Sequence, residues 1–203
     1  GMLYFSVGER GRMNEAQDPQ NHLGTVIRLQ ENGKVPQDNP FLNNRKGRAE
    51  IFSYGHRNPQ GMALHPKSGK IWVHEHGPQG GDEINILKAG ANFGWPKTTF
   101  GEQYGRGKIG IGPKSPGIEE PLLHWTPSIA PSGMDFYQGD IFPNWNGDLL
   151  VGSLKFRMLV RVDLEGSLVQ GQEVVFQDRI GRVRDVRVSP EGKVYLLNDE
   201  YRG

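Results

Sequence analysis

Residues 54–96 bring together the side chains of this chain that are best suited to bind a charged or metal-bound ligand. The segment carries the cation Arg57, the amide Asn58 and the carboxylates Asp82 and Glu83, and glycines recur between them. Glycines let backbone carbonyls approach a ligand closely, and each buried charge needs a partner. We therefore predict a buried polar or metal-bound ligand here rather than a plain apolar core.

Arg57 and Asn58 precede Pro59, which holds the residue before it in an extended conformation. This sequence is typical of a rigid loop that aims two side chains at one point. The planar guanidinium of Arg57 suits a carboxylate or a quinone oxygen. The alternative is a loop arginine paired with a surface acid.

Gly77 and Pro78 follow an apolar segment that reads as a strand, residues 71–75, and can present bare carbonyl oxygens to a hard cation. Calcium is the natural candidate, and an ordinary turn is the alternative. Asp82 and Glu83 come shortly afterwards. Their position permits either a second cation site or salt bridges to the Arg57 loop.

Three further cations stand at the ends of predicted strands: Lys155, Arg182 and Arg184. Because side chains alternate along an extended segment, Arg182 and Arg184 are expected on the same side. Together the three would clamp a polyanionic ligand. The alternative is a basic, solvated rim.

Composition narrows the class of protein. The 203 residues include 29 glycines and 14 prolines without a triplet period, which favours a turn-rich, all-β fold and excludes collagen. The net charge of +1 predicts no binding to nucleic acid or to an anionic membrane, and points to a small-molecule partner. The absence of cysteine excludes disulfides and thiolate metal sites, and no apolar stretch is long enough to predict a membrane span.

A glycine turn followed by a short apolar strand occurs three times, at residues 66–73, 144–151 and 190–197. A second apolar stretch precedes each copy, so hairpins are predicted, and hairpins at this spacing indicate propeller blades. Residues 2–7 look like a fourth strand without its turn. We expect outer strands at residues 24–29 and 159–164, and a long surface excursion at residues 97–120.

No linker divides the chain, so residues 1–203 are predicted to form a single, partial β-propeller domain of about four blades. Its blade edges would be open to self-association.

The motifs resemble the soluble quinoprotein glucose and aldose sugar dehydrogenases, six-bladed β-propellers that use pyrroloquinoline quinone (PQQ) with calcium. The similarity rests on residues 55–61, 75–85, 92–96, 129–133, 147–155 and 181–185, in family order along nearly the whole chain. It implies that aldose sugars are oxidised to lactones at the anomeric carbon, by hydride transfer to PQQ. It also implies an external electron acceptor and a periplasmic or secreted location.

The resemblance assigns roles position by position. Arg57 would be the catalytic cation at the reactive quinone edge, with Asn58 beside it. Lys155, Arg182 and Arg184 would hold the carboxylates and ring oxygens of PQQ. The metal ligands would be the carbonyls of Gly77 and Pro78 for the calcium that bridges to PQQ, and Glu83 with the backbone of Phe93 for a structural calcium. Phe93 replaces the usual tyrosine, which a carbonyl ligand should tolerate.

The chain also departs from the family pattern. The general base of the family is a histidine N-terminal to the stretch that resembles residues 3–11, so we expect a fragment without that base. Glu9 stands where the family commonly has aspartate. One alternative function is a non-catalytic propeller that binds a carbohydrate or a protein. Another is a calcium-dependent lactonase, which would need carboxylate and asparagine ligands instead of a cationic clamp.

Overall fold

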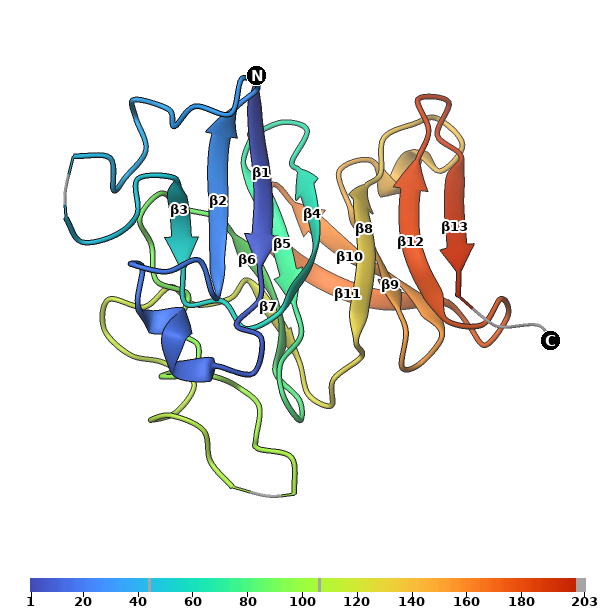
Figure 1. Cartoon of the computed structure of the whole chain (residues 1–203). Coiled ribbons are helices and arrows are strands. Elements are labelled where there is room, and N and C mark those ends of the chain that lie inside the picture. The colour runs from blue at the N-terminus through green and yellow to red at the C-terminus, as the bar shows by residue number, and fades with distance from the viewer. Residues whose placement is uncertain (44, 106, 200–203) are drawn as a thin grey trace.

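The structure is a computed structural model that describes residues 1–43, 45–105 and 107–199. Its strands form four antiparallel sheets (Figure 1), which we call blades 1 to 4 in chain order. Blade 1 contains β1 (Met2–Val7), β2 (Thr25–Gln30) and β3 (Ile51–Tyr54). Blade 2 contains β4 (Pro59–Leu64), β5 (Ile71–Glu75), β6 (Asp82–Ile86) and β7 (Leu123–Trp125).

Blade 3 contains β8 (Pro131–Phe136), β9 (Leu149–Ser153), β10 (Met158–Glu165) and β11 (Leu168–Gln177). Blade 4 contains β12 (Val183–Val188) and β13 (Val194–Asn198). Two short 3-10 helices, η1 (Met13–Gln17) and η2 (Pro143–Trp145), lie in connections. The strands of each blade pair in chain order, as expected for hairpins and meanders.

The first strand of each blade faces a common axis. β1 contacts β4, β4 contacts β8, and β8 contacts β12, and Figure 1 shows these strands standing side by side. Glycine makes this approach possible, because a Cβ on Gly133 of β8 would overlap the side chain and backbone of Asp185 on β12. The predicted partial propeller of about four blades is confirmed.

The apolar cores lie between neighbouring blades. The core between blades 2 and 3 is built around Trp72, Met134 and Leu149, and the core between blades 3 and 4 around Leu150 and Val186. Because side chains alternate along a strand, Leu149 and Leu150 of β9 enter the two different cores, and all five residues of β9 are buried.

The three predicted hairpins are confirmed as β4–β5, β8–β9 and β12–β13. The strands expected at residues 24–29 and 159–164 form as β2 and β10, but the prediction that they are outer strands is wrong. β2 lies between β1 and β3, and β10 lies between β9 and β11. The outermost strands were missed because β3 is short and β11 exposes most of its side chains, so neither shows a strong apolar signal.

Residues 88–122 form the expected excursion, with only isolated strand pairings in its described part. At the other end of the chain, β13 has no outer neighbour among the described residues, and Tyr195 and Leu197 on it are exposed. Self-association through this edge stays a prediction. None of the helices in the described ranges has the length and apolar character of a membrane span.

Candidate functional site

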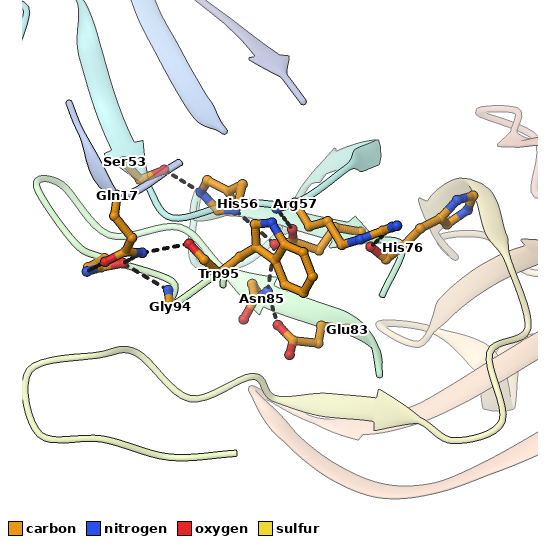
Figure 2. A network of polar contacts seen from close by, with 11 residues as sticks. Gln17, Ser53, His56, Arg57, His76, Glu83, Asn85, Gly94 and Trp95 are labelled. Carbon is orange, nitrogen blue, oxygen red and sulfur yellow. Dashed lines mark hydrogen bonds and ion pairs between the residues drawn. The ribbon is translucent and has the colours of Figure 1, made fainter. Parts of the chain in front are cut away.

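Arg57 lies in the short loop between β3 and β4, and its guanidinium is held by neutral groups. Nη1 donates hydrogen bonds to the carbonyls of His76 (3.0 Å) and Gly77 (2.8 Å). The guanidinium carbon lies 5.3 Å from the ring centroid of Trp95, within cation–π range (Figure 2). No carboxylate of the described residues pairs with this guanidinium. The alternative of a surface ion pair is therefore not what the structure shows, and the charge stays available to an anion.

The backbone of the Arg57 loop is fixed from beneath by Glu75, at the end of β5. One carboxylate oxygen accepts the Arg57 N–H (2.6 Å), and the other lies 2.9 Å from His56 Nδ1. His56 Nε2 in turn lies 2.9 Å from Ser53 Oγ (Figure 2). Glu75, His56 and Ser53 are all buried. We call residues 55–58, Glu75, His76 and Gly77 the Arg57 corner.

Sequence reasoning left His56 and His76 without roles and did not single out Glu75. A signal was present, because a carboxylate inside an apolar strand is rarely buried without partners. What the sequence does not show is that the partners of Glu75 lie in a loop 18 and 19 residues earlier in the chain.

The loop that carries Gly77 and Pro78 is anchored by Asp82. Asp82 accepts hydrogen bonds from the Gly77 N–H (2.9 Å), from Ser128 Oγ (2.8 Å) and from two backbone N–H groups at residues 129 and 130 (2.8 Å each). A Cβ on Gly77 would overlap the carbonyl of Gly80, so this loop can pack only with glycine there. Asp82 is thus occupied with backbone, and it makes no salt bridge to the Arg57 loop.

Glu83 instead faces a small cavity of about 10 Å³, which Glu75, Gly77 and Phe93 also line. Asn85 Nδ2 donates to both carboxylates, at 3.3 Å to Glu75 and 3.2 Å to Glu83, while its buried Oδ1 has no partner among the described residues. Burial of the carboxyl and the nearby charge of Glu75 raise the pKa of Glu83 to about 8. The Glu83 carboxylate is an oxygen donor of the kind that a hard cation prefers, and Arg57 lines the same cavity.

Beside the corner lies a large cavity of about 830 Å³, lined by Arg57, Asn58, Gly77, Pro78 and Lys155. Lys155 Nζ contacts the ring of its neighbour in the chain, 5.1 Å from the centroid, and no described carboxylate pairs with it. Five of the predicted site residues therefore converge on one cavity with two uncompensated cations. Glu83 and Phe93 line the adjoining small cavity, and Arg57, His76 and Gly77 line both.

Arg182 and Arg184 lie elsewhere, in what we call the arginine rim with Asp199. As predicted, they share one side of the chain, since both pair with Asp199. Arg184 lines a neighbouring cavity of about 370 Å³ between the inner strands, and Arg182 lines neither cavity. The structure does not bring these two cations together with Lys155, because they belong to the next blade and a carboxylate engages both.

The excursion reaches the large cavity as well, and sequence reasoning did not name its lining residues. Glu102 and Tyr104 line the cavity, and Tyr104 is exposed. Gln79 and Glu102 each donate an N–H to the carbonyl of the other at 3.0 Å. The excursion is thereby fastened to the loop of Gly77 and Pro78.

Comparison with known proteins agrees with this geometry. The family described as Glucose / Sorbosone dehydrogenase matches residues 1–203. The chain belongs to the glucose/sorbosone dehydrogenase family. Among its relatives in this family is the aldose sugar dehydrogenase YliI of Escherichia coli (strain K12), 44% identical over 205 residues that cover 100% of this chain and 55% of the relative.

Solved structures of the glucose/sorbosone dehydrogenase type share the fold. A crystal structure of a glucose dehydrogenase has a TM-score of 0.95 at 46% identity, covering 98% of this chain and 58% of that one. The PQQ-bound form of an aldose sugar dehydrogenase from Streptomyces coelicolor has a TM-score of 0.75 at 28% identity, covering 96% of this chain and 52% of that one. This chain therefore spans little more than half the length of the relatives it matches.

Proposed function

We propose that this chain supplies most of the cofactor site of a PQQ-dependent aldose sugar dehydrogenase. The observation that carries the proposal is the convergence of Arg57, Asn58, Gly77, Pro78 and Lys155 on one cavity whose two cations have no carboxylate partner. Arg57 is partly buried and Lys155 is exposed at this cavity, so an anionic ligand bound there could pair with both charges. The relatives named as sugar dehydrogenases, one of them PQQ-bound, support the same assignment.

The residues fit PQQ, which is a planar quinone with several carboxylates. A cavity of about 830 Å³ accommodates a cofactor and a sugar together. Arg57 would stabilise negative charge at the quinone edge, and Lys155 would hold a carboxylate. Arg182 and Arg184 would reach further carboxylates only by loosening their contacts with Asp199. When bound, PQQ supplies the group that accepts hydride from the anomeric carbon of an aldose, which leaves as a lactone.

Calcium fits two places. The carbonyls of Gly77 and Pro78 would hold the ion beside the cofactor, on a loop that Asp82 anchors. Glu83 and the backbone carbonyl of Phe93 would hold a structural ion in the small cavity. The raised pKa of Glu83 supports the second site, because a nearby cation would favour its ionised carboxylate.

Removing the hydroxyl proton of the sugar needs a general base. By family resemblance we expect this base to be a histidine outside residues 1–203. Buried Glu9 adjoins the corner, since its N–H donates to the Arg57 carbonyl (2.9 Å) while its Oε2 has no partner among the described residues. The external electron acceptor and a periplasmic or secreted location also belong to this proposal, and cell fractionation tests the location.

Thermal unfolding tests the cofactor site. With calcium present, PQQ is expected to raise the unfolding temperature of the chain, because a ligand that binds only the folded state stabilises it by mass action. The rise should disappear in Arg57→Ala combined with Lys155→Ala. It should persist in Lys193→Ala, which removes an exposed lysine of the β12–β13 turn.

Absence of a PQQ-dependent rise in the unsubstituted chain would favour the non-catalytic propeller that binds a carbohydrate or protein, or the lactonase. A second measurement addresses the chemistry. The full-length natural protein should oxidise aldoses with an artificial dye only when PQQ and calcium are both supplied. Dye reduction without PQQ would contradict the proposed reaction.

A further inference from the structure

The position of Arg57 depends on a residue that does not touch the large cavity. We propose that Glu75 is the positioning residue of the Arg57 corner: its carboxylate fixes the backbone of the loop so that the guanidinium points at the cofactor cavity. This inference rests on the proposed function, in which Arg57 meets the cofactor.

The Glu75 carboxylate contacts two successive residues of the loop, His56 and Arg57. One oxygen accepts the Arg57 N–H at 2.6 Å, and the other lies 2.9 Å from His56 Nδ1. The Arg57 N–H has no backbone partner among the described residues, so the bond to Glu75 is the one that satisfies it there. Hydrogen bonds to an ionised acceptor are shorter and roughly twice as strong as neutral ones. The loop is therefore fixed at the residue whose side chain must be aimed.

His56, which contacts the second carboxylate oxygen of Glu75, is itself held in one orientation. Its ring is fully buried and stacks on Phe93, with centroids 4.6 Å apart and planes 23° apart. Ser53 Oγ lies 2.9 Å from its Nε2, so both ring nitrogens have partners. A ring locked in this way presents Nδ1 to Glu75 in one orientation only, and Nδ1 must carry the proton because a carboxylate only accepts.

On its far side the loop is fixed by backbone, because the His76 N–H donates to the Asn58 carbonyl at 3.0 Å. Between these two attachments the Arg57 side chain runs to the His76 carbonyl and the face of Trp95 (Figure 2). It also donates to the Gly77 carbonyl. Both oxygens of Glu75 are already engaged. This leaves Glu83 as the carboxylate free to serve the small cavity, and separates the roles of the two acids.

A neutral amide replaces the carboxylate only in part. In Glu75→Gln the Arg57 N–H would meet a neutral oxygen in place of a carboxylate, and the NH₂ group could face His56 Nδ1 only if the imidazole proton moved to Nε2, with Ser53 Oγ accepting it. The matched control is Asp148→Asn. Asp148 is also buried and also accepts from a backbone N–H (Leu164, 3.0 Å) and a side chain (Arg161, 3.0 Å), but it lies in blade 3, away from the corner.

The test uses two readouts on the chain with its backbone amides assigned by NMR. The first is hydrogen exchange of the Arg57 amide without cofactor. It should be protected in the unsubstituted chain, and should exchange at least about tenfold faster in Glu75→Gln but not in Asp148→Asn. The second is PQQ affinity in calcium, which should fall at least about tenfold in Glu75→Gln only.

Each outcome decides the proposal. An unprotected Arg57 amide in the unsubstituted chain overturns it without any variant, even if Glu75→Gln fails to fold. Equal behaviour of Glu75→Gln and Asp148→Asn in the exchange readout overturns it as well. If the unsubstituted chain binds no PQQ, the proposed function fails, while the exchange comparison still decides whether Glu75 sets the loop.

Discussion

The Arg57 corner and the arginine rim hold the same kind of side chain in opposite ways. The guanidinium of Arg57 is bound by two carbonyls and an aromatic face, whereas Arg184 donates to the carboxylate of Asp199, with Nε at 2.9 Å. Neutral partners fix a cation without cancelling its charge, but a carboxylate does both. The guanidinium of Arg57 can therefore pair with an anionic ligand directly. Arg182 and Arg184 can do so only after their contacts with the Asp199 carboxylate are broken.

The largest effect should come from the corner. Arg57→Ala is expected to weaken PQQ binding in calcium by at least about 30-fold, since truncating one partner of a desolvated charge pair costs about 2 to 5 kcal/mol. Isothermal titration measures the affinity, with Arg161→Ala in blade 3 as the control. A loss no larger than that of the control would break the contrast between corner and rim.

The second prediction concerns the backbone under the corner. Gly77→Ala should lower the free energy of unfolding by about 1 to 3 kcal/mol, because the added Cβ would overlap the Gly80 carbonyl and force the loop to shift. Urea unfolding measures it. Gly171→Ala is the control, since a Cβ there meets nothing, and it should stay within about 0.5 kcal/mol. An equal change in the free energy of unfolding in the two variants would show that the loop accommodates a Cβ at residue 77.

The third prediction is a pH dependence. Burial and the nearby His76 lower the pKa of His74 to about 3, against 6.5 for an ordinary histidine. Below pH 6.5 His74 binds a proton in the unfolded chain but stays neutral in the folded chain. The contribution of His74 to the free energy of unfolding is therefore fully present above pH 6.5 and is lost as the pH falls toward 3. The loss should approach about 1.4 kcal/mol per pH unit.

Urea unfolding between pH 7.5 and 5 checks this slope. His74→Asn should flatten it, whereas the exposed His124→Asn should not. An unchanged slope in His74→Asn would mean that His74 is not held neutral in the folded chain.

The smallest effect should come from the rim. Asp199→Asn frees Arg182 and Arg184 from their shared carboxylate, and is expected to tighten PQQ binding only about twofold to threefold, because both arginines are partly exposed and screened. Repeating the titration at high salt should remove the gain. Weaker binding in Asp199→Asn would mean that Asp199 positions the arginines for the ligand.

Local motifs predicted much of this arrangement. The loops of Arg57 and of Gly77 were recognisable because glycine and proline dictate backbone shape within a few residues. The three hairpins were recognisable for the same reason. The sequence could not predict the hydrogen bonds of Glu75 to the Arg57 loop or of Asp199 to Arg184. Each joins residues that are 15 or more positions apart and meet only in the folded chain. The outermost strands escaped because exposure weakens their apolar pattern.

The paired hydrogen bonds between Gln79 and Glu102 have a practical consequence for protein engineering. On the return path, Ile111 and Thr99 make main-chain bonds to Lys97 (2.8 Å) and Gly112 (3.1 Å). The described residues between these attachments, 103–105 and 107–109, are thus bounded by main-chain bonds that need no particular side chain. Since closure entropy grows slowly with loop length, loops of varied length can be grafted there while the carbonyl pair of Gly77 and Pro78 stays in place.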